Sequence, residues 1–120
     1  MPELLSQQKD DVLVVQFTSP KILSDVVIAQ IGRELLELAD DTDAKMLLNF
    51  QGVTFMSSAM IGKIVLLNKK CKANKTTIKL CNISPSIMEV FEITRLNKVF
   101  SIYKSEEEAL TAFGKKGWFS

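Results

Sequence analysis

The sequence contains no histidine. Without an imidazole, the chain has no histidine general base, no serine–histidine or cysteine–histidine nucleophile pair and no histidine metal ligand. That absence excludes most familiar hydrolase mechanisms. Cysteine is scarce as well, since only Cys71 and Cys81 occur, outside any CxxC pair. We therefore expect two buried, unpaired thiols and no metal centre.

An excess of charge of one sign is also missing, because 15 basic and 14 acidic residues leave a formal net charge of +1. Proteins that coat nucleic acids carry far more positive charge, so we expect no direct nucleic-acid partner. No stretch approaches the roughly 18 apolar residues of a membrane span. The first six residues lack the charged region and the apolar run of a signal peptide. We therefore expect a cytoplasmic protein that does not bind a membrane.

The composition that remains is typical of one globular domain, with 47% hydrophobic and 24% charged residues in a chain of 120. No internal repeat, low-complexity tract or linker interrupts it. We predict a single domain over residues 1–114 and a short C-terminal tail over residues 115–120. In that tail Trp118 and Phe119 are either loosely packed, which we favour, or a docking element.

Short runs of β-favouring residues alternate with runs that have helical spacing. The segment VLVVQF at residues 12–17 is almost continuously apolar, which suits a strand covered on both faces. The turn-like segment at residues 9–11 precedes it, so residues 3–8 are expected to pair back as a short edge strand. The same criteria predict further strands at residues 45–50, 76–81 and 100–103.

Helices are predicted between these strands. Apolar residues recur at helical intervals over residues 26–38 and 61–71. Ser84 before Pro85 predicts a short helix through Thr94, and Ser105 before three glutamates predicts a last helix that ends at Gly114. Crossover helices generally enforce parallel connections. We therefore predict a single α/β domain, with a mixed, mainly parallel sheet of four or five strands and about four helices.

Three enzyme-like motifs that occur in α/β folds were compared with the chain, and none fits. A P-loop needs a hydroxyl after its Gly-Lys pair, but Ile64 follows Gly62 and Lys63 inside a predicted helix. A dinucleotide-binding fold needs a glycine-rich turn after the first long strand, where residues 18–21 read TSPK. A phosphoacceptor response domain needs a carboxylate where Asn49 stands. We expect neither a catalysed reaction nor a bound cofactor.

The segment at residues 47–62 combines a strand, a loop, two adjacent serines and the start of a helix. A serine at a helix start ordinarily caps the amides of the first turn, and one hydroxyl is enough for that purpose. Capping therefore leaves the second serine unexplained. A phosphoryl group here would meet free backbone amides and the positive end of the helix dipole, so its charge would act mainly on a docked partner.

The run VTFMSSAMIG at residues 53–62, after the strand LLNF, resembles the anti-sigma factor antagonists, the bacterial STAS domains. The predicted element order over residues 3–113 and the later blocks LCNISP, at residues 80–85, and VFEITRL, at residues 90–96, resemble that family too. The resemblance implies partner switching. The unmodified protein would bind an anti-sigma factor or a serine kinase of the histidine-kinase-like ATPase type, and phosphorylation would release it.

The family motif Asp-Ser-Ser/Thr-Gly-Leu-Gly implies that Ser58 is the phosphoacceptor, with Ser57 as the alternative. Ser57 stands in place of the aspartate, Met60 replaces the first glycine and Gly62 matches the last one. We expect a chain that is a monomer or weak dimer. Its expected partner-binding residues are Met56, Ser57, Ser58, Ala59, Met60, Gly62 and Lys63.

Two other interpretations of this region remain open. Five lysines between residues 63 and 75 indicate either a solvated basic helix end, which we favour, or a site for a nucleotide or an acidic partner. Met88 joins Met56 and Met60 as a candidate for an adaptable apolar contact surface, and at least one of the three is expected to belong to the core. The alternative function is a non-phosphorylated STAS scaffold or sensor that binds a nucleotide or lipid in a signalling assembly.

Overall fold

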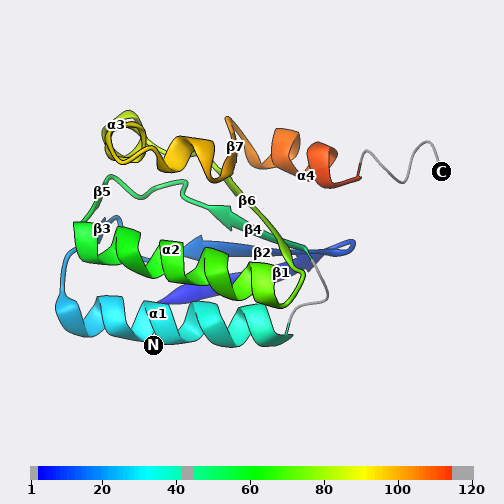
Figure 1. The fold of residues 1–120 in the computed structure, drawn as a ribbon, viewed down its shortest axis with the longest axis horizontal. Helices are drawn as coiled ribbons and strands as arrows, with labels where there is room; N and C mark the ends of the chain where they lie inside the picture. The colour runs from blue at the N-terminus through cyan, green and yellow to red at the C-terminus, as the bar shows by residue number, and fades with distance from the viewer. Residues whose placement is uncertain (1–2, 42–44, 115–120) are drawn as a thin grey trace.

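The computed structural model describes residues 3–41 and 45–114, and the predicted tail lies outside the described residues. Within those residues a five-stranded sheet has the strand order β1-β2-β4-β6-β7 (Figure 1). Its strands are β1 (Leu4–Lys9), β2 (Val12–Phe17), β4 (Lys45–Asn49), β6 (Thr77–Cys81) and β7 (Ser101–Tyr103). The helices are α1 (Asp25–Asp41), α2 (Ser58–Ala73), α3 (Pro85–Ile93) and α4 (Glu106–Gly114), with a short 3-10 helix η1 (Leu96–Lys98).

The sheet is mixed and mainly parallel, as the sequence predicts. β1 runs antiparallel to β2, and β2, β4, β6 and β7 are parallel neighbours. The hairpin between β1 and β2 turns at Asp10, whose φ of 55° lies in the left-handed region. An aspartate tolerates that conformation better than most residues, which explains why it stands in a two-residue turn.

Helices cover both faces of the sheet because the buried strand residues alternate between two clusters. Val15, Leu48 and Leu80 belong to the larger core, which α1 and α2 cover. The neighbouring residues on β2 and β4, Val14 and Leu47, belong to a smaller core that α4 closes. Strands that are apolar on both faces are therefore covered on both faces, as parallel strands require. Figure 1 shows α1 and α2 side by side and α4 at the opposite face.

Two short strands form a second, parallel sheet that the sequence does not predict. β3 (Lys21–Ile22) pairs with β5 (Phe55–Met56), in segments expected to be a turn and a loop. The Pro20 carbonyl accepts hydrogen bonds from the amides of Thr54, at 2.7 Å, and Phe55, at 3.2 Å. Strands of two residues are too short to show a period in the sequence, so only the fold brings these segments together.

The predicted helix signals are largely confirmed. The Ser84 hydroxyl accepts a hydrogen bond from the amide of Ile87 at 3.4 Å, and Pro85 occupies the first turn of α3. The Ser105 hydroxyl likewise accepts a bond from the amide of Glu108 at 3.1 Å at the start of α4. The boundaries of α1 and α2 extend beyond the predicted ranges, because apolar periodicity marks only the buried part of a helix.

Both cysteines are buried and free, as expected. Burial raises the pKa of Cys71 to about 11 and that of Cys81 to about 12, with the charge of Glu106 adding to the rise at Cys81. Both side chains are therefore neutral thiols near neutral pH and behave as small core residues. In the part of the chain that the structure describes, no helix is long and apolar enough to cross a membrane.

Candidate functional site: the start of helix α2

Backbone hydrogen bonds hold both ends of the segment that leads from β4 to α2. Phe50 follows β4 and is fully buried, and its carbonyl accepts a bond from the amide of Val53 at 3.0 Å. Gly52 between them has a φ of 88°, a conformation that a side chain rarely allows. The amide of Ser57 then bonds to the carbonyl of Ile22 at 3.0 Å. This path places the start of α2 beside β3.

Ser57 is the N-cap residue of α2, but its side chain makes no capping hydrogen bond. Its carbonyl accepts the first helical bonds, from Met60 at 3.0 Å and Ile61 at 3.2 Å, while its hydroxyl oxygen is buried without a hydrogen-bond partner among the described residues. The expectation that a serine hydroxyl caps this helix is therefore wrong, because the Ser57 hydroxyl accepts no bond from the first-turn amides. The amides of Ser58 and Ala59 precede any acceptor that the helix itself supplies.

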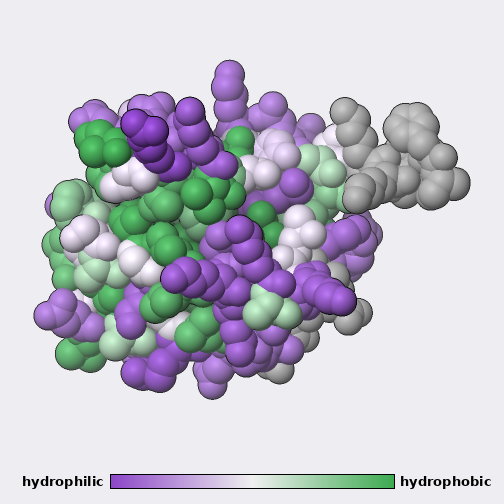
Figure 2. All heavy atoms as spheres, viewed as in Figure 1, coloured by the Kyte–Doolittle hydropathy of each residue, from purple (hydrophilic) through white to green (hydrophobic). Residues whose placement is uncertain are grey.

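Ser58 opens α2 with an exposed side chain, on a surface that is largely apolar. Gly62 and Leu66 follow Ser58 at successive intervals of four, and Ala59 precedes Gly62 by three, so all are exposed on the same side of the helix. We call this the Ser58 surface; it consists of Leu23, Phe55, Ser58, Ala59, Gly62 and Leu66. Figure 2 shows hydrophobic side chains gathered between α3 and the N-terminal half of α2, over β5, and hydrophilic ones over its C-terminal half.

Two of the predicted contact residues belong to the core and not to this surface. Met56 is 5% exposed and Met60 is fully buried, so neither presents a thioether to a partner. Met60 lies on the helix face that also buries Ile64 and Leu67, which places it inward. Met88 is partly buried against the same core. The predicted methionine surface is therefore wrong for Met56 and Met60.

Phe55, Leu23 and Leu66 take the place of those methionines, with side chains that are 49%, 53% and 49% exposed. None of these three residues is among the contact residues predicted from the sequence. Alternation along β5 turns Phe55 outward where Met56 turns inward, and the helical interval from Gly62 assigns Leu66 to the outer face. The sequence contains this alternation, but it identifies the outward residues only when the ends of β5 and α2 are known.

Lys63 lies mainly in the contact between α1 and α2. A Cβ placed on Gly32 of α1 would meet the Lys63 side chain at 3.0 Å, so the lysine stem packs on that glycine. Further along α2, Lys70 pairs with Asp40 of α1 at 3.1 Å, which lowers the pKa of that aspartate. Part of the lysine-rich segment therefore joins two helices, and it does so with partly exposed side chains.

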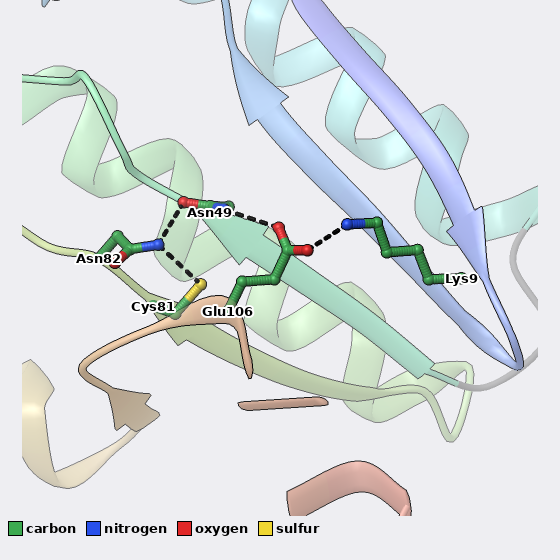
Figure 3. A network of polar contacts seen from close by, with 5 residues as sticks. All are labelled: Lys9, Asn49, Cys81, Asn82 and Glu106. Atoms are coloured by element: carbon green, nitrogen blue, oxygen red, sulfur yellow. Dashed lines mark hydrogen bonds and ion pairs between the residues drawn. The ribbon is translucent and has the colours of Figure 1, made fainter. Parts of the chain in front are cut away.

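A polar network holds the start of the loop that leads to Ser58 (Figure 3). The buried Asn49 side chain donates to Glu106 at 2.8 Å and accepts from the amide of Gln51 at 2.9 Å and the side chain of Asn82 at 3.0 Å. Lys9 pairs with the other carboxylate oxygen of Glu106. The network thus joins the ends of β1, β4 and β6 to the first turn of α4.

The charge of Glu106 is stabilised by that network. The hydrogen bond from Lys9 is the main cause that lowers the pKa of Glu106, the bond from Asn49 adds to it, and partial burial opposes both. From the sequence alone, this glutamate is predicted only at a helix start and Asn49 only at the end of a strand. Their meeting depends on segments 57 positions apart, and no local pattern contains it.

We predict that this carboxylate contributes to the pH dependence of stability. Because the folded pKa lies below the usual value of 4.5, the unfolded chain binds a proton more readily, and the free energy of unfolding falls as the pH drops below that value. Glu106→Gln should cost about 1 kcal/mol at pH 7 and flatten the acid limb. Urea unfolding between pH 7 and pH 3 measures both effects. The matched control is Glu108→Gln, an exposed residue in the same helical turn, and equal acid limbs for the two variants would contradict the assignment.

An α/β domain with α1 and α2 on one sheet face and an exposed serine opening α2 is the arrangement that the family resemblance implies. Comparison with known families confirms the family resemblance, because residues 3–109 match the STAS domain. The chain belongs to the STAS domain family.

Three relatives illustrate the similarity. BtrV of Bordetella bronchiseptica, a proposed anti-sigma factor antagonist, is 29% identical over 84 residues, which are 70% of this chain and 72% of that protein. A STAS domain protein from Planctomyces limnophilus is 26% identical, with a TM-score of 0.82 over 93% of this chain and 98% of its own. The Bacillus cell fate determinant SpoIIAA in its phosphorylated form, 19% identical, matches in fold with a TM-score of 0.70 over 92% and 98% of the two chains.

Proposed function

We propose that this chain is an anti-sigma factor antagonist that acts by partner switching, and that phosphorylation of Ser58 controls it. One observation carries the proposal. Ser58 is exposed at the first turn of α2, where the preceding serine makes no capping bond, and exposed apolar side chains lie on the same helix and on the segments that lead to it. In this proposal the chain catalyses no reaction, and it works in the cytoplasm, where sigma factors act.

The local backbone supports a phosphoryl group at Ser58. Such a group carries a charge of about −1.5 to −2 near neutral pH. The first-turn amides that lack a helical acceptor, together with the positive end of the helix dipole, favour an anion at this position. The structure of Bacillus SpoIIAA in its phosphorylated form adds that a protein of the same fold can carry a phosphoryl group. The phosphorylated chain is therefore expected to stay folded.

The charge acts on the partner, which we propose is an anti-sigma factor or a serine kinase of the histidine-kinase-like ATPase type. The unmodified Ser58 surface offers Phe55 and Leu66 for an apolar contact. Closing that contact over a phosphate removes the charge from water. An unpaired charge in a desolvated contact costs several kcal/mol, which is enough to release the partner.

A groove between α3 and β7 favours a second candidate function, a scaffold or sensor that binds a nucleotide or lipid without phosphorylation. The groove has a volume of about 490 Å³. Its lining includes Ile83, Met88 and Ile102 beside the polar Tyr103 and Lys104, which suits a ligand with apolar and polar parts.

Phosphosite mapping tests the main proposal. We expect a serine kinase that copurifies with the tagged chain to transfer phosphate from ATP to Ser58, as seen by mass spectrometry, and Ser58→Ala to abolish the transfer. Ser57→Ala is the matched control and should remain a substrate, because the Ser57 oxygen is buried. Phosphate on Ser57 would show that the acceptor is the neighbouring serine. Micromolar binding of a nucleotide or lipid, without any kinase, would favour the second candidate.

A further inference from the structure

The strand β1 leaves one edge of the sheet open. It is the first strand in the order β1-β2-β4-β6-β7, so among the described residues no strand lies against its outer side (Figure 1). In an antiparallel pair, successive residues direct their backbone groups alternately toward the partner strand and away from it. The Glu3 carbonyl accepts the amide of Thr18 at 3.1 Å, so the odd-numbered residues face β2. The amides and carbonyls of Leu4, Ser6 and Gln8 therefore point to the open edge.

Over residues 4–8 this edge carries none of the features that usually prevent strand addition, and Lys9 at the end of β1 is engaged in its ion pair with Glu106. Residues 4–8 read LLSQQ, without a charge or a proline, and Leu5 is 56% exposed. Natural proteins commonly protect edge strands with lysines, prolines, bulges or very short strands. β1 is six residues long and pairs with β2 in an unbroken register. The edge is thus suited to receive another strand.

A groove beside β1 determines which side chains would suit an added strand. It has a volume of about 350 Å³ and is lined by Leu4 and Ser6 of β1 and by Glu34, Glu37 and Leu38 of α1. Every second side chain of an added strand would enter this groove, because side chains alternate between the two sheet faces. The groove lining carries two carboxylates and no cation, so it complements lysine or arginine. On the opposite face the added strand would meet the exposed Leu5.

We propose that β1 is a docking edge for an extended segment of a partner protein in which basic side chains alternate with apolar ones. The segment adds to the sheet as a sixth strand, with its basic side chains toward Glu34 and Glu37. A second copy of this chain is a poorer occupant, because a two-fold interface brings the same patch against itself and sets these glutamates against their own kind. No residue of this edge belongs to the Ser58 surface.

Two peptides of six residues, the length of β1, test the proposal. One alternates lysine with valine and the other alternates glutamate with valine, both with blocked ends and a fluorescent label. Fluorescence anisotropy should show that the lysine peptide binds about tenfold or more tightly than the glutamate peptide. Hydrogen exchange of the Ser6 and Gln8 amides should slow on binding, because the added strand accepts their hydrogen bonds.

Variants separate backbone pairing from charge. Ser6→Pro removes an outward amide that β2 does not use, and it should weaken the lysine peptide about tenfold, whereas Ser6→Ala should bind normally. Glu37→Lys keeps the edge intact and should abolish the preference for lysine, which covers the case in which the proline variant unfolds. Glu89→Lys, exposed on α3, is the matched charge control.

Equal binding of the two peptides, or a lysine peptide that is insensitive to both Ser6→Pro and Glu37→Lys, would overturn the proposal. So would a homodimer of the free chain whose formation protects the Ser6 amide, because the occupant would then be a second copy. Ser58→Asp should leave peptide binding unchanged. The result is therefore independent of whether the phosphorylation proposal succeeds.

Discussion

Ser58→Asp should weaken binding of the chain to its anti-sigma factor or kinase about 100-fold, which corresponds to about 2.8 kcal/mol of binding free energy. The carboxylate places a negative charge where the Ser58 surface would otherwise close over an apolar contact. Charges that are desolvated without a partner are costly, whereas the same charge in water at a helix N-terminus is favourable. The effect should therefore appear in the complex and not in the free chain. Titration calorimetry with the purified partner measures it.

Stability distinguishes this effect from unfolding. Because the Ser58 side chain is exposed, Ser58→Asp should change the free energy of unfolding by no more than about 1 kcal/mol. Ser58→Ala is the matched control and should bind the partner as the unmodified chain does. A carboxylate has less charge than a phosphate, so the phosphorylated chain should bind more weakly still. If Ser58→Asp binds normally while phosphorylation also leaves binding unchanged, Ser58 does not control the partner.

The sheet and its helices could be predicted because each long element carries its own signal. Residues 12–17 and 45–50 are mostly apolar runs, and residues 61–71 have helical spacing, so the pattern of buried positions indicates the type of each element. β3 and β5 could not be predicted, since their pairing depends on bonds between Pro20 and residues more than thirty positions away. The local hydrophobic pattern predicts an element when that element is long enough to bury one face over several residues.

The candidate site was predicted in position but not in composition. A strand, a loop and two serines correctly place Ser58 at the start of α2. Which neighbours face outward depends on where β5 and α2 begin, and a shift of one residue in a strand reverses every side chain. Met56 was predicted at the surface because its thioether is adaptable, and without a predicted strand at β5 no alternation distinguished it from Phe55. Whether Ser57 caps the helix depends on the rotamer of one side chain, which no sequence pattern specifies.

The two phenylalanines that flank this loop have opposite expected roles, and Phe50 should be the more important for stability. Its side chain is fully buried and its ring centroid lies 5.0 Å from that of Phe17. Phe50→Ala should cost about 3–5 kcal/mol of unfolding free energy, because it removes buried apolar surface and leaves a cavity. Guanidinium chloride unfolding measures this loss as a lower midpoint concentration, with an unchanged dependence of the unfolding free energy on denaturant.

Phe55→Ala is the matched comparison, because it deletes the same group from a side chain that is 49% exposed. We expect it to change stability by less than about 1 kcal/mol and to weaken partner binding about tenfold, since the lost surface belongs to the docking contact. Phe50→Ala should show the reverse, with binding retained by whatever fraction stays folded. Partner affinity measured at a temperature where both variants are folded separates the two roles. A Phe55→Ala chain that binds its partner at full strength would remove Phe55 from the Ser58 surface and place the contact elsewhere on the domain.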